Sequence, residues 1–242
     1  MSSMWANLIL PGRGCSSLED IQVKLRFYVE RARSRGLFLS IINLDPFDFE
    51  TILHCVFLQT TAHWAGVFIS AQKQENIKEV LEYFSRHPEK IPNLSSFGFR
   101  TLNSGNILSS ILPPNLTSLS SLRALRIEGF THPFALRSMS VDWGRLTSLR
   151  LHIRAHSVTY LDILSQCHHL EHLYISPLDE DIGGATTIQP VELPTLRQLL
   201  IKSRDTPSYM LRRLVTPFIE RLSFDFPGPK IFQRGLRHLS VH

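Results

Sequence analysis

The sequence predicts an α/β fold in which short parallel strands line one side and irregular helices cover the other, and two observations lead to this prediction. First, the pattern apolar-x-x-apolar-x-apolar recurs in LSSFGF, LRALRI, LTSLRL, LEHLYI, LRQLLI, IERLSF and LRHLSV, which start at residues 94, 122, 146, 170, 196, 219 and 236. Second, successive copies start 28, 24, 24, 26, 23 and 17 residues apart. Most of these steps lie within or near the range of about 20 to 29 residues that is typical of leucine-rich repeats. We therefore expect a leucine-rich-repeat solenoid, a horseshoe with parallel strands on its concave face and helices on its convex face.

Weaker copies of the pattern extend the series toward the N-terminus. They are WAGVFI from Trp64, SRGLFL from Ser34 and WANLIL from Trp5. Together with the clearer copies they predict ten short strands in a single irregular repeat domain that spans residues 1–242. Because strands at this spacing are joined by crossovers and not by tight hairpins, the sheet is expected to be parallel.

Three segments between the strands, residues 17–32, 76–87 and 206–215, carry apolar side chains at the spacing of a helix. A capping box precedes the first, Pro88 ends the second, and a proline stands in the first turn of the third. Segment 177–194 has no apolar stripe, so we predict a loop there.

The turns after the strands depart from the usual leucine-rich repeat. An asparagine or cysteine normally stands three positions after the third apolar residue, where its side chain satisfies the turn backbone. In this sequence those positions hold Leu102, Phe130, Arg154, Leu178 and Arg204. We therefore expect irregular turns without an asparagine ladder.

Strand alternation predicts which residues face a partner. Successive side chains of a strand point to opposite faces, so the residues between the apolar positions face the concave side. Arg126 and Arg150 then occupy equivalent positions on adjacent strands, with Cα atoms about 5 Å apart. Two interpretations follow: Glu128, diagonally opposite, compensates the two like charges, or an anionic group of a partner is held between them. The candidate partner-binding residues on this face are Arg126, Arg150, Tyr174, His152 and Lys202.

The row formed by Arg126, Arg150 and Tyr174 suits an acidic or phosphorylated segment of a protein partner. Arginine pairs with carboxylate or phosphate in a bidentate manner, and tyrosine contributes rigid contact area. On this hypothesis, Arg126→Ala or Arg150→Ala weakens partner binding by ~1 to 3 kcal/mol and leaves the melting temperature nearly unchanged.

Composition excludes several classes of protein. With 43% hydrophobic and 19% charged residues, the chain is expected to fold. The net charge of +5 is modest and its basic residues are spread along the chain, which argues against nucleic-acid binding. No export signal and no membrane-length apolar run is visible, and three distant cysteines indicate reduced thiols. We expect a cytoplasmic or nuclear protein that binds no membrane.

No segment carries the signature of an enzyme. The sequence lacks a G-x-S-x-G elbow, a phosphate-binding G-x-x-x-x-G-K-[ST] loop and an H-E-x-x-H helix. The densest group of candidate metal ligands is Cys167, His168, His169 and His172. The repeat places His168 on a turn and His172 on a strand, and no second ligand pair accompanies them. We therefore predict no catalytic, cofactor-binding or metal-binding residues.

The first segments of the chain follow one another in the order WANLILP, SLEDIQVKLRFYVERA, RGLFLSI and AHWAGVFIS, before the irregular leucine-rich repeats. In this order the chain resembles the F-box proteins that are abundant in mushroom-forming fungi. The resemblance implies the substrate-recognition region of an F-box-type ubiquitin ligase receptor, in which an F-box binds a Skp-type adaptor and the repeats hold a protein substrate. Met1 stands only four residues before Trp5, so we expect no F-box within this sequence, and an adaptor only if an F-box is encoded upstream. The alternative is a stand-alone leucine-rich-repeat binding module with no ligase role.

Overall fold

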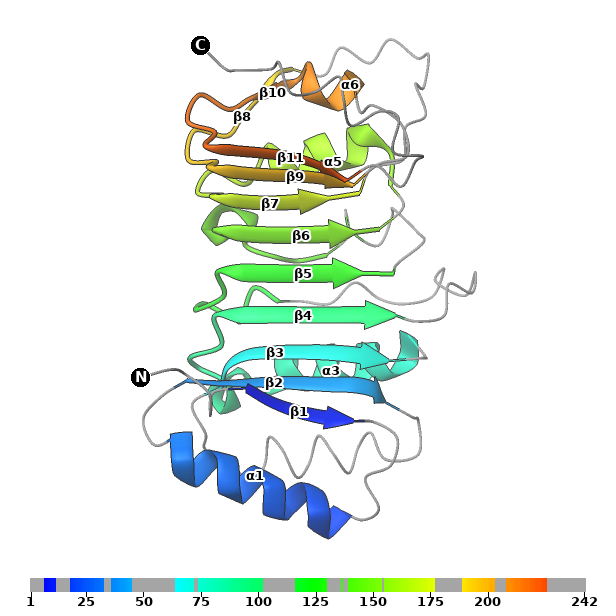
Figure 1. Cartoon of the computed structure of the whole chain (residues 1–242), viewed down its shortest axis with the longest axis vertical. Helices are drawn as coiled ribbons and strands as arrows, with labels where there is room; N and C mark the ends of the chain where they lie inside the picture. The colour runs from blue at the N-terminus through cyan, green and yellow to red at the C-terminus, as the bar shows by residue number, and fades with distance from the viewer. Residues whose placement is uncertain are drawn as a thin grey trace.

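A parallel β-sheet organises the chain. The computed structural model describes residues 7–11, 18–32, 36–44, 64–71, 74–101, 116–129, 136, 139–153, 155–176, 189–202 and 208–225. Within these residues, nine parallel strands lie side by side in the order of the sequence (Figure 1). The strands are β1 (Asn7–Pro11), β2 (Leu37–Leu44), β3 (Trp64–Ala71), β4 (Ser96–Thr101), β5 (Ala124–Glu128), β6 (Ser148–His152), β7 (His172–Ile175), β9 (Gln198–Lys202) and β11 (Arg221–Asp225). The predicted α/β class and the parallel sheet are confirmed.

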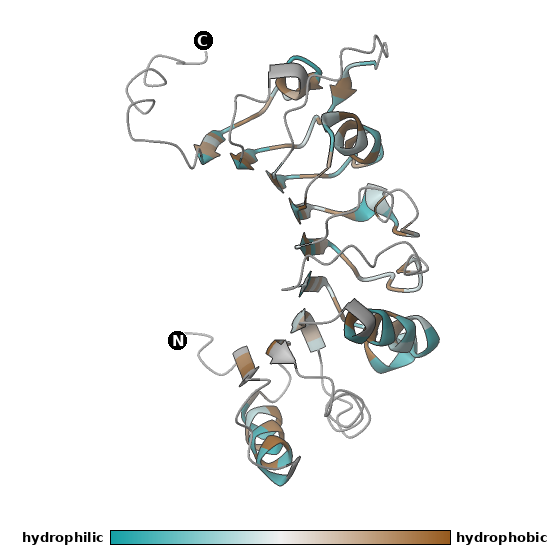
Figure 2. Cartoon of the chain, turned by 90° about the vertical axis from the view of Figure 1, so that its right-hand side faces the viewer, coloured by the Kyte–Doolittle hydropathy of each residue, from teal (hydrophilic) through white to brown (hydrophobic). Residues whose placement is uncertain are grey.

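Helices cover one side of the sheet. Figure 2 shows the strands along the inner side of an arc and the helices on its outer side. We call the inner side of the sheet the concave face. The helices are α1 (Leu18–Ala32), α3 (Gln74–Arg86), α5 (Ser157–Leu164) and α6 (Ser208–Leu211), with the 3-10 turns η2 (Pro88–Lys90) and η4 (Trp143–Arg145).

The predicted helices at 17–32 and 76–87 are confirmed as α1 and α3, and α3 begins two residues earlier than expected, at Gln74. Ile21 and Leu25 of α1 are buried as the apolar stripe predicts. Nine of the ten predicted strands are present, and the tenth, from residue 236, lies outside the described residues. The five turn positions without asparagine also lie outside them.

The prediction of a helix through 206–215 is wrong after Leu211. Leu214–Val215 forms β10, which pairs in parallel with β8 (Val191–Glu192). The Val191 amide donates to the Arg213 carbonyl at 2.7 Å, so the backbone of this segment is satisfied as a strand and not as a helix. The same pairing places a strand within 177–194, where only a loop was expected. Helix α5 was not predicted, because most of its side chains are buried and it shows no polar stripe.

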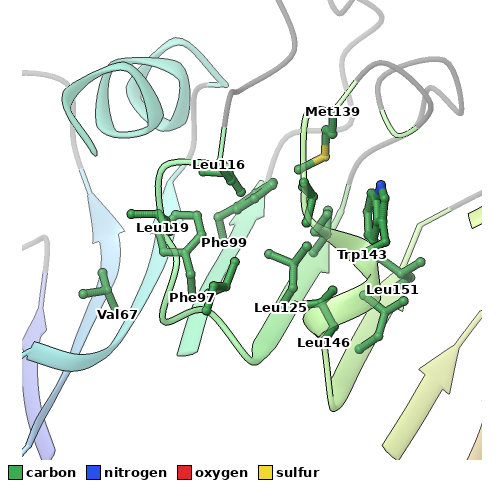
Figure 3. Packing of buried hydrophobic residues seen from close by; sticks show 14 of the residues in the cluster. Val67, Phe97, Phe99, Leu116, Leu119, Leu125, Met139, Trp143, Leu146 and Leu151 are labelled. Atoms are coloured by element: carbon green, nitrogen blue, oxygen red, sulfur yellow. The ribbon is translucent and has the colours of Figure 1, made fainter. Parts of the chain in front are cut away.

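The three apolar positions of the repeat pattern form the core. All three are buried in the five copies that start at residues 94, 122, 146, 170 and 196. Figure 3 shows Leu125 and Leu151 from the strands packed with Leu119 and Trp143 from the intervening segments. At the edge strand β11, by contrast, Leu222 is 43% exposed.

A regular backbone ladder joins the turns that precede the central strands. The Ser95 carbonyl accepts hydrogen bonds from the amides of Arg123 and Ala124, at 2.8 and 2.9 Å. The carbonyls at the same position of the following copies accept the same pair of hydrogen bonds, and they belong to Arg123, Thr147, Glu171 and Arg197. Successive copies therefore stack in one register, which fixes the residues that neighbour one another on the concave face.

Candidate partner-binding site on the concave face

One row of residues crosses the concave face from β1 to β11. We call it the central row, and it consists of Ile9, Ser40, Phe68, Gly98, Arg126, Arg150, Tyr174, Leu200 and Ser223. The structure thus places Arg126, Arg150 and Tyr174 side by side on three consecutive strands. Their side chains are partly exposed, as are those of most outward positions on the central strands. A ligand that lies across the strands would meet these residues in sequence.

Glu128 lies between the two arginines of this row. Its Oε1 atom accepts a hydrogen bond from Arg126 Nε at 2.8 Å and lies 2.9 Å from Arg150 Nε. The Arg150 contact is an ion pair without an aligned hydrogen bond. A third arginine, Arg100, places its Nε 4.0 Å from Glu128 Oε2. We call Arg100, Arg126, Arg150 and Glu128 the arginine cluster; three positive charges and one negative charge leave a surplus of two positive charges.

The carboxylate of Glu128 holds the cluster in place. Burial alone would raise its pKa, but the hydrogen bond from Arg126 and the charges of Arg126, Arg150 and Arg100 outweigh burial, so the pKa lies below its usual value. Glu128 therefore stays ionised at neutral pH. This contact corrects one expectation: Arg126→Ala removes a hydrogen bond to a buried carboxylate, so it should lower the free energy of unfolding by about 1 kcal/mol, and the melting temperature should fall.

This geometry bears on both interpretations of the arginine pair. Glu128 compensates part of the charge, as one of them expects, yet a single carboxylate serves three arginines. The side chains of Arg126 and Arg150 remain 40% and 42% exposed. The cluster therefore keeps accessible positive charge that an anionic group of a partner can reach.

Aromatic rings support the two arginines from either side. The Cζ atom of Arg126 lies 4.3 Å from the ring centroid of Phe68, and that of Arg150 lies 4.3 Å from the ring centroid of Tyr174. Gly98 lies between Phe68 and Arg126, and a Cβ atom there would stand 2.8 Å from Phe68 Cδ2. Because Gly98 on β4 has no side chain, Phe68 on β3 and Arg126 on β5 contact each other across β4.

His152 and Lys202, the other candidate residues, have different surroundings. The His152 ring lies 6.2 Å from the Tyr174 ring in an edge-to-face arrangement. Burial lowers the pKa of His152, and the positive charges of Lys202, Arg150 and Arg100 add to this against the opposing effect of Glu128. Lys202 Nζ lies 3.7 Å from Asp225 Oδ2, so the structure pairs Lys202 with an acid on β11 and not with the arginine cluster.

The repeat pattern alone did not point to Phe68 or Arg100 as site residues, nor to one carboxylate that joins three arginines. The signal for Phe68 is present in the weak copy WAGVFI. There, Phe68 is the residue between two apolar positions, so the rule of alternation places it on the concave face. Its stacking with Arg126 follows from Gly98 in the next copy.

The cysteine and histidines of CHHLEHLYI do not converge. Cys167 is buried, its Sγ donates to the Ile163 carbonyl at 3.3 Å, and burial raises its pKa to about 12. His168 and His169 lie exposed in the turn, and His172 is exposed at the start of β7. In the part of the chain that the structure describes, no three histidine, cysteine, aspartate or glutamate side chains gather as metal ligands.

Comparison with known proteins identifies no family. No family model matches the chain, and no curated protein is significantly similar to it. Within the described segments, no helix is both long and apolar enough to span a membrane. Function is therefore inferred from the concave face itself.

Proposed function

We propose that this chain is a leucine-rich-repeat solenoid that acts as a protein-interaction scaffold and binds a partner on its concave face. The single observation that carries the proposal is the arginine cluster, with its surplus of two positive charges at the centre of that face. The repeat pattern, the parallel strands in chain order and the arc of the sheet support the solenoid (Figure 2).

The partner group that fits this centre is an acidic or phosphorylated segment. Arginine side chains bind carboxylate and phosphate groups with two parallel hydrogen bonds. Here Glu128, Phe68 and Tyr174 already hold the guanidinium groups of Arg126 and Arg150. A preorganised pair of arginines loses less side-chain entropy on binding than two mobile arginines do, so the free-energy cost of binding is lower.

The more specific form of the proposal is the substrate-recognition region of an F-box-type ubiquitin ligase receptor. Its support is the resemblance in the order of the opening segments, and the concave face would then hold the protein to be ubiquitinated. The alternative is a repeat module that binds its partner without a ligase. An F-box encoded in frame upstream of Met1, together with co-purification of a Skp-type adaptor, would favour the first; a product that starts at Met1 and retains no adaptor would favour the second.

Selection of random peptides displayed on phage tests the binding proposal. The full chain should enrich sequences rich in aspartate and glutamate, and the Arg126→Ala/Arg150→Ala double variant should lose this enrichment while remaining folded. A parallel array of peptides with and without phosphoserine distinguishes the two anions. Enrichment without acidic residues, or acidic enrichment that persists in the folded double variant, would contradict the proposal.

A further inference from the structure

The concave face is apolar at its N-terminal end. Ile9 on β1 is 60% exposed, and Phe38 and Ile42 on β2 are 43% and 39% exposed. These side chains lie on the concave face, because their neighbours in the same strands, among them Leu8 and Leu39, are buried on the opposite side. We call Ile9, Phe38 and Ile42 the apolar end. A group of exposed apolar residues on one sheet face is typical of an interaction surface.

The apolar end continues to the arginine cluster. The Phe38 ring lies directly over Gly66 on β3, where a Cβ atom would collide with the ring. Phe68, on the same strand as Gly66, is partly buried and stacks with Arg126. Apolar and aromatic side chains thus surround Ser40 on the face from β1 to β3, and they end where the positive charge begins.

The face is different on the other side of the cluster. Beyond Tyr174 the central row continues with Leu200 and Ser223, and the nearby charges of Lys202 and Asp225 pair with each other. Among the described residues, the exposed large hydrophobic side chains of the concave face therefore belong to β1 and β2. The apolar end and the arginine cluster therefore follow one another in a fixed order across the strands.

We propose that the concave face recognises a two-part segment of a partner protein, in which an apolar side chain binds the apolar end and an acidic or phosphorylated residue binds the arginine cluster. This inference rests on the proposed function and adds an apolar group and its separation from the anionic group. The segment lies extended across the strands, because its two contacts are on β2 and on β5 with β6.

The strand spacing sets the distance between the two groups. Neighbouring strands lie about 4.8 Å apart, so the centre between Arg126 and Arg150 is about 17 Å from β2, measured across the strands. An extended segment rises about 3.3 Å per residue, so about five residues separate its apolar and anionic groups. Because the face is concave, the straight-line distance is shorter. We therefore expect the two groups to be separated by no fewer than about four residues.

A series of synthetic peptides tests this inference. Each fluorescent peptide of glycine and serine carries one tryptophan and a pair of aspartates, separated by about one to about eight residues, in both chain orders. A second series carries phosphoserine in place of the aspartates. The dissociation constant of each peptide for the full chain is measured by fluorescence polarisation. Affinity should be highest at a separation of about four to five residues, about fivefold lower at the shortest separation, where the peptide cannot reach both contacts, and about twofold lower at the longest.

Variants of the chain test whether the tryptophan of the peptide binds the apolar end. Phe38→Ser should remove the dependence on spacing and leave unchanged the affinity for a peptide that has aspartates but no tryptophan, which also shows that the variant folds. Ile42→Ser is an independent test of the same end. Phe218→Ser, which changes an exposed phenylalanine in the turn before β11, is the matched control and should leave the profile unchanged.

The outcomes separate the two proposals. Binding that needs Arg126 and Arg150 but shows no dependence on spacing would overturn the two-part segment and leave the proposed function in place. A dependence on spacing that survives both Phe38→Ser and Ile42→Ser would also overturn it. If no acidic or phosphorylated peptide binds at all, the proposed function fails as well.

Discussion

The two faces of strands β6 and β7 differ although they share one backbone. Leu149 and Leu173 point to the helices and are buried, whereas Arg150 and Tyr174, the next residues along each strand, are partly exposed on the concave face. The buried side contributes stability through apolar area removed from water. The concave side keeps charge in contact with solvent. Alternate residues of each strand therefore build the core and the partly exposed concave face, so substitutions one residue apart should have very different effects on stability.

The largest effect is expected on the buried side. Leu173→Asp places an unpaired carboxylate in the core of the repeat and should lower the free energy of unfolding by about 4 kcal/mol, enough to unfold a marginally stable chain. The matched change His172→Asp, one residue away and exposed, should cost no more than about 0.5 kcal/mol. Urea unfolding followed by circular dichroism measures both. Equal losses would mean that the two faces are not separated in this way.

The second-largest loss of stability is expected at Glu128, whose buried charge lies on the concave face. Glu128→Gln removes the carboxylate that three arginines share. Removing one partner of a fully buried ion pair costs about 3 to 5 kcal/mol, but these arginines are partly exposed to water, so we expect about 2 kcal/mol. Thermal unfolding at neutral pH measures the loss. A variant as stable as the original chain would show that Glu128 does not hold the cluster.

The same residue predicts a pH dependence. The pKa of Glu128 is lowered in the folded chain, so its stabilising contribution is complete above the ordinary glutamate pKa of about 4.3 and is lost as pH falls through the lower folded pKa. The difference in stability between the original chain and Glu128→Gln should therefore shrink as the solution is acidified below about pH 4. Urea unfolding at a series of pH values tests this, and a difference that stays constant or grows on acidification would contradict it.

A smaller effect is expected where the strands end. The buried hydroxyl of Tyr160 shares its single proton between the carbonyls of Ile153, at 2.8 Å, and Ser176, at 3.1 Å, which follow β6 and β7. Tyr160→Phe leaves these carbonyls without this donor and should cost about 1 to 1.5 kcal/mol in unfolding free energy. Tyr174→Phe on the concave face is the control and should change stability by less than about 0.5 kcal/mol. If both substitutions cost the same, the Tyr160 hydroxyl has no special role at the strand ends.

The sequence predicted those parts of the fold that follow local rules. The period of the apolar pattern located nine strands, and alternation along each strand assigned Leu149 and Arg150 to opposite faces. Helix α5 escaped prediction because burial on most sides removes the polar stripe that marks a surface helix. Strands β8 and β10 have two residues each and form only through contact with each other, so their own sequences carry no strand signal.

The candidate site was predictable in its register but not in its contacts. The repeat alone places Arg126, Arg150 and Tyr174 in one row. That the buried Glu128 contacts two of them depends on which side-chain directions the neighbouring strands allow, and residues of several repeats decide this together. The stacking of Arg126 on Phe68 further requires a glycine on the strand between them.

Titration calorimetry with a peptide that carries an aspartate pair measures whether the arginine cluster binds an anionic segment. Arg150→Ala should weaken binding by ~1 to 3 kcal/mol and reduce the dependence of the affinity on salt. Arg86→Ala, which changes an exposed arginine on helix α3, should leave both quantities unchanged. If Arg150→Ala binds the peptide as tightly as the original chain, or if the two variants lose the same affinity, the cluster is not the recognition centre.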